Sequence, residues 1–200
     1  PARPISWRGA IIDGFGQLIA TLRQVRHHGD IARFLLARLF YNDGLVTLFA
    51  VGGIFAKTTF GMTTAEVLQF GVAINLTAGL GAAGFAWIDD WIGSKRTILI
   101  SLAGLIIIAA GVLSAETTLA FLIWGSLLGI FVGPVQAASR SMMAHLAPAH
   151  LRTEMVGLYA LSGKATAFLG PAALAWATTA AGSQRVGMAT IVVFLAIGMV

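Results

Sequence analysis

The sequence predicts an all-α membrane protein in which six helices cross the bilayer. Of its 200 residues, 58% are apolar and only 10% are charged, whereas soluble domains carry about 25% charged residues. The charged residues gather in short segments between long apolar runs, and a run of about 20 residues crosses a hydrocarbon core of about 30 Å as a helix. Composition and spacing therefore exclude a soluble globular domain before any motif is considered.

Each expected span is an apolar run bounded by polar or charged residues. In chain order the spans cover residues 34–56, 65–88, 97–114, 117–138, 154–180 and 186–200, the last of which is cut short. Residues 1–33 are polar and basic, and we expect them to form a cytoplasmic linker. Apolar residues recur there at helical spacing, which is typical of an amphipathic helix on the membrane surface. An ordinary linker with one helical turn is the alternative.

The first span, Phe34–Ala56, carries Asp43 near its middle. A carboxylate at that depth costs about 3 kcal/mol or more unless another group pairs with it. Lys164 lies about as deep in the fifth span. We therefore expect Asp43 and Lys164 to form an ion pair in a substrate or coupling site. The alternatives are a permanent pair that only fixes helix packing, and an Asp43 that takes up a proton during transport.

Other polar residues extend this expected site. Tyr41 and Asn42 flank Asp43 and can hydrogen-bond a ligand, and Asn75 on the second span is a further cavity candidate. Arg38 lies a little more than one turn from Asp43, and we expect its side chain to reach the cytoplasmic surface. The polar residues at the end of the fourth span are expected to be solvated at the inner mouth, and a gate is the alternative: Gln136, Ser139 and Arg140.

Small residues and prolines predict close helix contacts and bends. Gly125, Gly129 and Gly133 repeat every four residues and make a flat strip along the fourth span, which lets another helix approach closely. Gly133 is followed by Pro134, which predicts a kink that frees a backbone carbonyl. Gly170 and Pro171 predict a bend in the fifth span.

Two features concern the second and third spans. Thr63 with Glu66 three residues later is a capping-box signature, which predicts where the second helix begins. The third span carries no ionisable group, and we expect it to face lipid.

The basic residues predict the orientation in the membrane. Residues 1–33, 89–96 and 139–153 hold nine Lys and Arg, and the opposite turns hold two, which favours a cytoplasmic N-terminal segment. The same placement argues against a nucleic-acid partner despite the net charge of +5. The chain has no cysteine, and its four histidines fall in polar connecting segments, so we expect no metal site and no cofactor.

The segment from Ala86 to Arg96 resembles a known loop motif. Asp90, Gly93, Lys95 and Arg96 match the motif that transporters of the major facilitator superfamily carry between the second and third helices of each half, although the superfamily usually has glycine in place of Ala86. An acid at a helix end with paired bases beyond it can bridge to a neighbouring helix and lock one conformation of a cytoplasmic gate.

Three longer segments resemble the C-terminal half of the bacterial branch of this superfamily that is related to the yeast autophagy-linked vacuolar amino acid effluxer. They are Arg33–Gly44, Gly133–Pro148 and Gly157–Pro171. The resemblance implies half of a twelve-helix fold, with the N-terminal six-helix half missing from this chain. It also implies amino acids as candidate substrates. Six spans divide as three and three, which is typical of the inverted repeats of secondary transporters.

The function we infer is secondary active transport. The protein is expected to move a small polar solute by alternating access, coupled to protons, with the lipid bilayer, the solute, H+ and the missing six-helix half as its partners. The alternative is a membrane-embedded interaction or scaffold module without transport activity. An enzyme is not expected, because the sequence has no HExxH motif, no nucleophile elbow and no cysteine. The sequence also has no glycine-rich phosphate loop, which argues against a built-in ATPase motor.

Overall fold

The computed structural model describes residues 29–148, 152–164 and 166–199. Every regular element within these residues is an α-helix. In chain order the helices are α2 (Gly29–Phe60), α3 (Thr64–Ile92), α4 (Ser94–Ser114), α5 (Thr118–Leu146), α6 (Arg152–Ser162), α7 (Leu169–Ala181) and α8 (Gln184–Ile197). The surface helix expected in the N-terminal linker lies outside the described residues.

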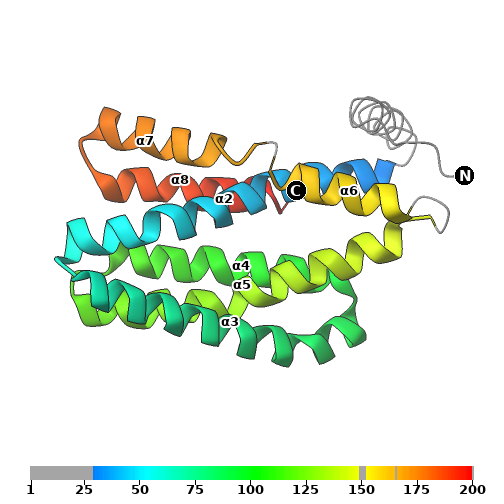
Figure 1. Cartoon of the computed structure of the whole chain (residues 1–200), viewed down its shortest axis with the longest axis horizontal. Helices are drawn as coiled ribbons and strands as arrows, with labels where there is room; N and C mark the ends of the chain where they lie inside the picture. Colours follow the sequence, from blue (N-terminus) through cyan, green and yellow to red (C-terminus); the bar gives the residue numbers. More distant parts are fainter. Residues whose placement is uncertain (1–28, 149–151, 165, 200) are drawn as a thin grey trace, which may run out of the picture.

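Four of these helices, α2, α3, α4 and α5, are long and apolar enough to cross a membrane. The shortest of the four, α4, has 21 residues, and at 1.5 Å per residue it matches a hydrocarbon core of about 30 Å. The helices lie side by side and alternate in direction (Figure 1). The chain is therefore an integral membrane protein. The apolar helix α8 is shorter, with 14 residues.

The expected fifth span, residues 154–180, is two helices rather than one. A break between Ser162 and Leu169 separates α6 from α7, and both helices run opposite to α5, one after the other (Figure 1). Pro171 explains the break, because it has no N–H for the carbonyl of Ala167 and its ring would clash with that carbonyl in a continuous helix. The first turn of a new helix tolerates proline. The bend expected at Gly170 and Pro171 is thus the start of α7.

The expected charged turn at residues 89–96 is almost entirely helical. Only Gly93 separates α3 from α4. Its φ of 83° lies in a region that side chains other than hydrogen rarely allow, which is why glycine stands there. Asp90 therefore lies in the last turn of α3, and Lys95 and Arg96 lie in the first turn of α4.

The start of α3 carries the expected capping box. Thr63 N donates to the Glu66 carboxylate at 2.7 Å, and Glu66 N donates to Thr63 Oγ1 at 3.3 Å. Lys57, near the end of α2, donates to Thr64 Oγ1 at 2.8 Å. Local sequence thus fixes both the start of α3 and its connection to α2.

The glycine row of α5 lies against α3. A Cβ added at Gly129 would overlap Thr77 Oγ1, and one added at Gly133 would overlap the carbonyl oxygen of Ala78. The same Thr77 hydroxyl donates to the carbonyl of Ser126 at 2.8 Å. Glycine at these positions therefore lets the two backbones approach closely enough for a side chain of one helix to hydrogen-bond the backbone of the other.

Pro134 leaves the carbonyl of Ile130, one turn earlier, without its usual N–H donor. That carbonyl faces Gly81 of α3, where an added Cβ would overlap it. The expected freed carbonyl is therefore covered by a glycine of the neighbouring helix.

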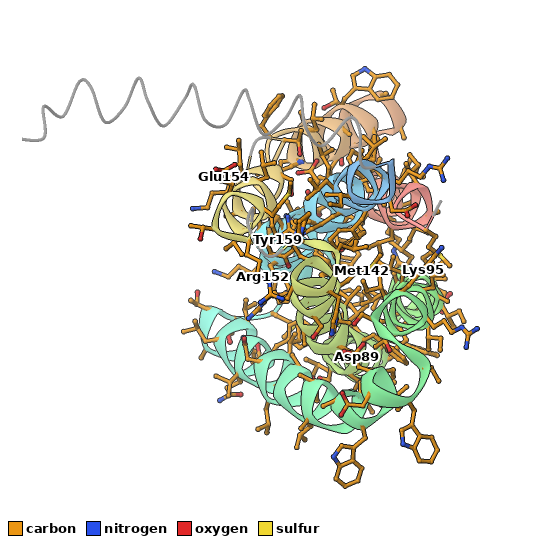
Figure 2. All side chains as sticks on the ribbon, turned by 90° about the vertical axis from the view of Figure 1, so that its right-hand side faces the viewer. Asp89, Lys95, Met142, Arg152, Glu154 and Tyr159 are labelled. Atoms are coloured by element: carbon orange, nitrogen blue, oxygen red, sulfur yellow. The ribbon has the colours of Figure 1, made fainter. Side chains whose placement is uncertain are left out.

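The expectation that the third span faces lipid is wrong. Of its most apolar stretch, 44% is buried, against 6% for α3. The reason is that α4 packs against both α5 and α8, and Leu102 and Leu105 are fully buried there. Apolar composition does not separate a lipid-facing helix from a packed one, because lipid tails are as apolar as leucine. Instead, α3 lies at the edge of the bundle (Figure 2).

Gly133→Ala is expected to destabilise the protein by about 1–3 kcal/mol, because the added Cβ would meet backbone atoms that move only if α3 moves. Thermal melting of the purified full-length protein in detergent measures the effect. Gly79→Ala on α3 is the matched control, since no atom lies within 4 Å of a Cβ added there. Equal melting temperatures for the two variants would contradict the packing described for α3 and α5.

Candidate functional site

The break between α6 and α7 exposes two helix ends inside the bundle. The last carbonyls of α6 and the first N–H groups of α7 have no partners within their own helices. Backbone groups buried away from water need partners in the protein. The neighbouring helix α2 contacts both α6 and α7, and three of its polar side chains reach the break.

Asp43 binds the start of α7. Its carboxylate is 1% exposed, and its Oδ2 accepts from the backbone N–H of Gly170, the second residue of α7, at 2.7 Å. The residue that precedes α7, Phe168, supplies no side-chain cap. Asp43 therefore caps α7 from another helix, and the partial positive charge of the helix N-terminus favours its negative charge.

Gly170 is packed tightly against α2. A Cβ at this position would overlap the hydroxyl of Thr47, which itself donates to the carbonyl of Asp43 at 2.7 Å. Glycine is therefore needed for the N–H of residue 170 to come within hydrogen-bonding distance of the carboxylate.

Arg38 binds the end of α6. Its Nη1 donates to the carbonyl of Tyr159 at 2.7 Å and to Ser162 Oγ at 2.8 Å, and its guanidinium carbon lies 3.5 Å from the centre of the Tyr159 ring. Asn42 adds a bond from Nδ2 to the carbonyl of Gly163 at 3.0 Å. A cation is favoured at a helix C-terminus and over an aromatic face.

The expectation that Arg38 reaches the cytoplasmic surface is therefore wrong. Its side chain is only 8% exposed. A lysine or arginine extends to the membrane surface when nothing at depth receives its charge. Here the C-terminal end of α6 provides carbonyl acceptors beside it.

The expected ion pair between Asp43 and Lys164 is not formed. Lys164 is exposed and lies in the break, where its backbone N–H donates to the carbonyl of Leu161 at 2.9 Å. The helical register that would carry a lysine side chain inward stops at Ser162. In its place, the N-terminus of α7 receives the carboxylate of Asp43. Within the described part of the chain, Asp43 Oδ1 has no hydrogen-bond partner.

A polar cavity of about 110 Å³ lies beside this break, between α2, α5 and α6. Its lining residues are Arg38, Tyr41, Asn42, Leu45, Gln136, Ser139, Arg140 and Tyr159. Tyr41 and Ser139 are both buried, and their hydroxyl groups form a hydrogen bond of 2.7 Å. The expectation that Ser139 is solvated is therefore wrong. Gln136 and Arg140, by contrast, are exposed.

Sequence reasoning did not select Tyr159 or Ser162. Both lie more than 120 positions from the α2 residue that they contact, and no local pattern marks them. The only available signal was Arg38 itself, because a buried cation needs acceptors.

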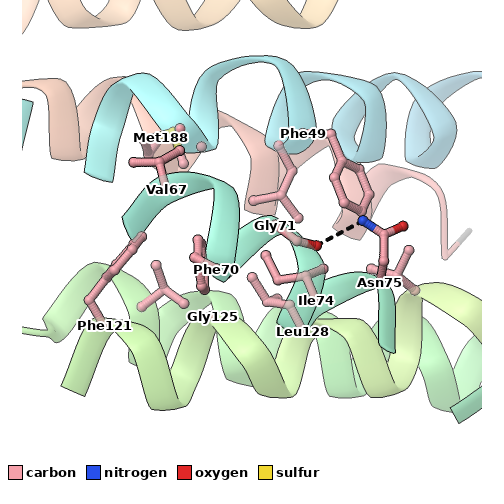
Figure 3. Close-up of a pocket in the computed structure, with 15 residues that line it drawn as sticks. Phe49, Val67, Phe70, Gly71, Ile74, Asn75, Phe121, Gly125, Leu128 and Met188 are labelled. Atoms are coloured by element: carbon pink, nitrogen blue, oxygen red, sulfur yellow. Dashed lines mark hydrogen bonds between the residues drawn. The ribbon is translucent and has the colours of Figure 1, made fainter. Parts of the chain in front are cut away.

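Asn75 lies at a second cavity, of about 150 Å³, between α2, α3 and α5 (Figure 3). Its Nδ2 donates to the carbonyl of Gly71 at 2.8 Å, so its side chain stays near its own helix. The walls are otherwise apolar and include Phe70, which packs where a Cβ on Gly125 would lie. The structure therefore does not bring Asn75 together with Asp43.

The residues of the expected gating loop are all at one end of the bundle, where α3 ends and α4 begins (Figure 2). Among the residues that the structure describes, Asp90, Lys95 and Arg96 form no ion pair. The contact across the junction is instead made by Asp89, whose Oδ2 accepts from Ser94 Oγ at 3.2 Å. The expected bridge to a neighbouring helix is thus not formed in this conformation.

Comparison with known proteins identifies similar sequences. The family model described as "Vacuole effluxer Atg22 like" matches residues 1–200. An uncharacterized MFS-type transporter, YxiO, of Bacillus subtilis is 25% identical over 95% of this chain and 44% of its own length. Autophagy-related protein 22 of Coccidioides immitis is 26% identical over 90% of the chain and 32% of its length. Autophagy-related protein 22-1 of Neosartorya fischeri is 29% identical over 96% and 33%.

The chain thus spans less than half the length of these curated relatives. No solved structure matches it significantly. The matched family is described as one of effluxers and one relative is named a transporter, so the expectation that the chain is not an enzyme is confirmed.

Asp43→Leu is expected to lower the stability of the protein by about 1–3 kcal/mol more than Asp43→Asn does, because asparagine keeps an acceptor for Gly170 N and leucine leaves that N–H unpaired. Melting curves of the two variants of the full-length protein provide the comparison. Asp90→Leu and Asp90→Asn, at an exposed position of α3, should differ little. Equal melting temperatures for Asp43→Leu and Asp43→Asn would show that the cap on α7 does not stabilise the protein.

Arg38→Lys is expected to speed hydrogen exchange in the last turn of α6 about tenfold, because lysine keeps the charge but loses the planar stack on Tyr159 and the paired hydrogen bonds. Hydrogen–deuterium exchange with mass spectrometry measures this. Arg140→Lys, at an exposed position lining the same cavity, is the control. Unchanged exchange in Arg38→Lys would show that the guanidinium does not hold the end of α6.

Proposed function

We propose that this chain, which belongs to the family described as vacuole effluxer Atg22 like, is the C-terminal half of a secondary active transporter. The transporter would move a small polar solute, with amino acids as the candidate class, by alternating access. The observation that carries the proposal is the broken helix at α6 and α7, whose two ends bind a cation and an anion of α2 beside a polar cavity. Secondary transporters bind charged solutes and ions at the ends of such discontinuous helices.

The helices fit six membrane passes. We assign them to α2, α3, α4, α5, the broken pair α6–α7, and α8, as a 3+3 inverted repeat within half of a twelve-helix major facilitator fold. The share of 44% of the Bacillus subtilis relative supports a missing half of similar size. Basic residues at the end shown in Figure 2 support a cytoplasmic placement of that end in a bacterial plasma membrane.

An amino acid suits the two helix ends because it carries both of the charges that they bind. Its carboxylate can replace Asp43 at Gly170 N, and its ammonium group can replace Arg38 at the carbonyl of Tyr159. Each replacement would release one half of the broken helix from α2. Binding of the solute would thereby be coupled to movement of α6 and α7, with Tyr41 and Asn42 as further hydrogen-bonding groups at the cavity.

Asp43 is also the residue that we propose for proton coupling. One of its oxygens already binds the N-terminus of α7, and the other is buried without a partner in the described part of the chain. A proton on the free oxygen would neutralise the carboxylate and weaken its attraction to the helix N-terminus. Protonation of Asp43 would then favour detachment of α7 from α2, and detachment of α7 would favour protonation of Asp43.

Counterflow and gradient-driven uptake in liposomes with the full-length protein test the function. We expect exchange of at least one amino acid by the wild type, and accumulation that depends on a proton gradient. Asp43→Asn should retain exchange but lose about tenfold or more of the gradient-driven accumulation, since it cannot bind and release a proton. Absence of exchange for every amino acid would overturn the proposal, and full gradient-driven uptake by Asp43→Asn would remove Asp43 from coupling.

Lys164 remains a predicted substrate residue. Lys164→Gln in the same counterflow assay should lower exchange of amino acids if the exposed ammonium group attracts the substrate carboxylate. Lys95→Gln, a matched loss of an exposed lysine at the junction of α3 and α4, is the control. Equal exchange in the two variants would remove Lys164 from the substrate path.

A further inference from the structure

A pocket of about 360 Å³ lies where α3 meets α4, against the end of α5, at the end of the bundle that faces the viewer in Figure 2. The transport proposed above gives it no role. Three basic side chains line it: Lys95 and Arg96 from the first turn of α4, and His145 from the last turn of α5. We call it the basic pocket. Its other lining residues are Ile92, Gly93, Ser94, Met142 and Leu146.

The positive charge of the basic pocket has no counter-charge. Lys95, Arg96 and His145 are all exposed, and their side chains form no ion pair with any part of the chain that the structure describes. No carboxylate is among the lining residues. The acid closest to them in the hydrogen-bond pattern, Asp89, accepts from Ser94 Oγ. The basic pocket therefore offers its charge to an anion from outside the bundle.

The place of Lys95 and Arg96 on α4 is unfavourable by itself. The N-terminus of a helix carries a partial positive charge, which favours acids in the first turn and disfavours bases. The start of α3 follows this rule with Glu66, whereas α4 has no acid in its first turn and no side-chain cap. An anion bound in the basic pocket would offset both the two bases and the charge of the helix end.

The basic pocket lies at a membrane surface. Both α3 and α4 are long and apolar enough to cross a membrane, and Gly93 alone separates them, so their junction marks one face of the bilayer. The 21 residues of α4 are about as long as the hydrocarbon core is thick, which puts its first turn at the level of the headgroups. Trp87 and Trp91, near the end of α3, are 81% and 92% exposed, and tryptophan is enriched at this level.

The walls of the basic pocket suit a lipid headgroup better than a free anion. Beside the three bases, Ile92, Met142 and Leu146 supply apolar surface. The volume is that of a pocket for a small organic molecule, about 300 Å³ or more. Inorganic phosphate would use the charges alone. A phospholipid carries its phosphate next to glycerol and the start of the acyl chains, and these can contact the apolar walls.

We propose that the basic pocket binds the headgroup of an anionic phospholipid, with the phosphate between Lys95, Arg96 and His145. Basic pockets between membrane-spanning helices bind such headgroups. The bound lipid would join the start of α4 to the end of α5 and so stabilise this end of the bundle, because a ligand that binds only the folded state raises its stability. This proposal does not depend on transport activity.

Thermal melting of the full-length protein in detergent, titrated with dioleoylphosphatidylglycerol, tests the proposal. We expect a saturable rise in melting temperature, and a smaller rise with dioleoylphosphatidylcholine, whose choline group cancels the phosphate charge. Lys95→Gln combined with Arg96→Gln should raise the phosphatidylglycerol concentration at half effect about tenfold or more, because each basic residue near the surface strengthens binding about fivefold. Both positions are exposed, so the variant should fold, and its melting curve without lipid verifies this.

Two control variants separate the basic pocket from general surface charge. Arg33→Gln combined with Arg152→Gln removes two exposed bases near the starts of α2 and α6, at the same end of the bundle but outside the basic pocket (Figure 1). The half-effect concentration should change little in this variant. Lys95→Arg combined with Arg96→Lys keeps both charges and should bind phosphatidylglycerol nearly as the wild type does.

Four results would overturn the proposal. Equal effects of the two lipids would mean that the headgroup charge is not recognised. An equal loss in both glutamine variants would assign binding to the general surface charge, and a loss in the charge-keeping variant as large as with glutamine would exclude charge as its basis. A rise in melting temperature with inorganic phosphate or glycerol 3-phosphate at millimolar concentration that equals the rise with phosphatidylglycerol would assign the basic pocket to a soluble anion.

Discussion

The structure depends on satisfying the backbone at a break within the helix bundle. Between α6 and α7 the chain leaves helical carbonyls and N–H groups without partners in their own helices. Arg38 and Asn42 bind the end of α6, and Asp43 binds the start of α7. Two charges that would each be costly at this depth are therefore retained because each is matched to a helix end of opposite partial charge.

This constraint also organises the helix that supplies the side chains. α2 is continuous over 32 residues, so its polar turn near the break and its apolar turns beyond Leu45 have a fixed spacing. α5 follows the same division, polar at Gln136 and apolar at Val132. The faces of α2 and α5 that line the two cavities thus change from polar to apolar along the helices.

In the transport cycle that we propose, a charged solute would replace the contacts that stabilise the break. A permanent ion pair between two side chains would have to be separated before a solute could bind, and this separation would leave both buried charges without partners. A helix end, by contrast, offers several backbone groups and can exchange one carboxylate for another with little change in geometry. The packing of α3 on α5 through glycines gives a firm support on one side, while α6 and α7 contact α2 through a few polar groups.

The sequence by itself determined the membrane class, the start of α3 at Thr63 and the presence of a carboxylate that needs a partner at depth, because composition, capping and burial cost are local properties. Only the tertiary structure decided that Asp43 binds Gly170 N instead of Lys164, that Arg38 stays inside, and that α3 rather than α4 lies at the edge. These outcomes join residues more than 120 positions apart or depend on which apolar face finds another helix. The pattern of hydrophobicity along the sequence predicts neither the long-range contacts nor which apolar face is packed.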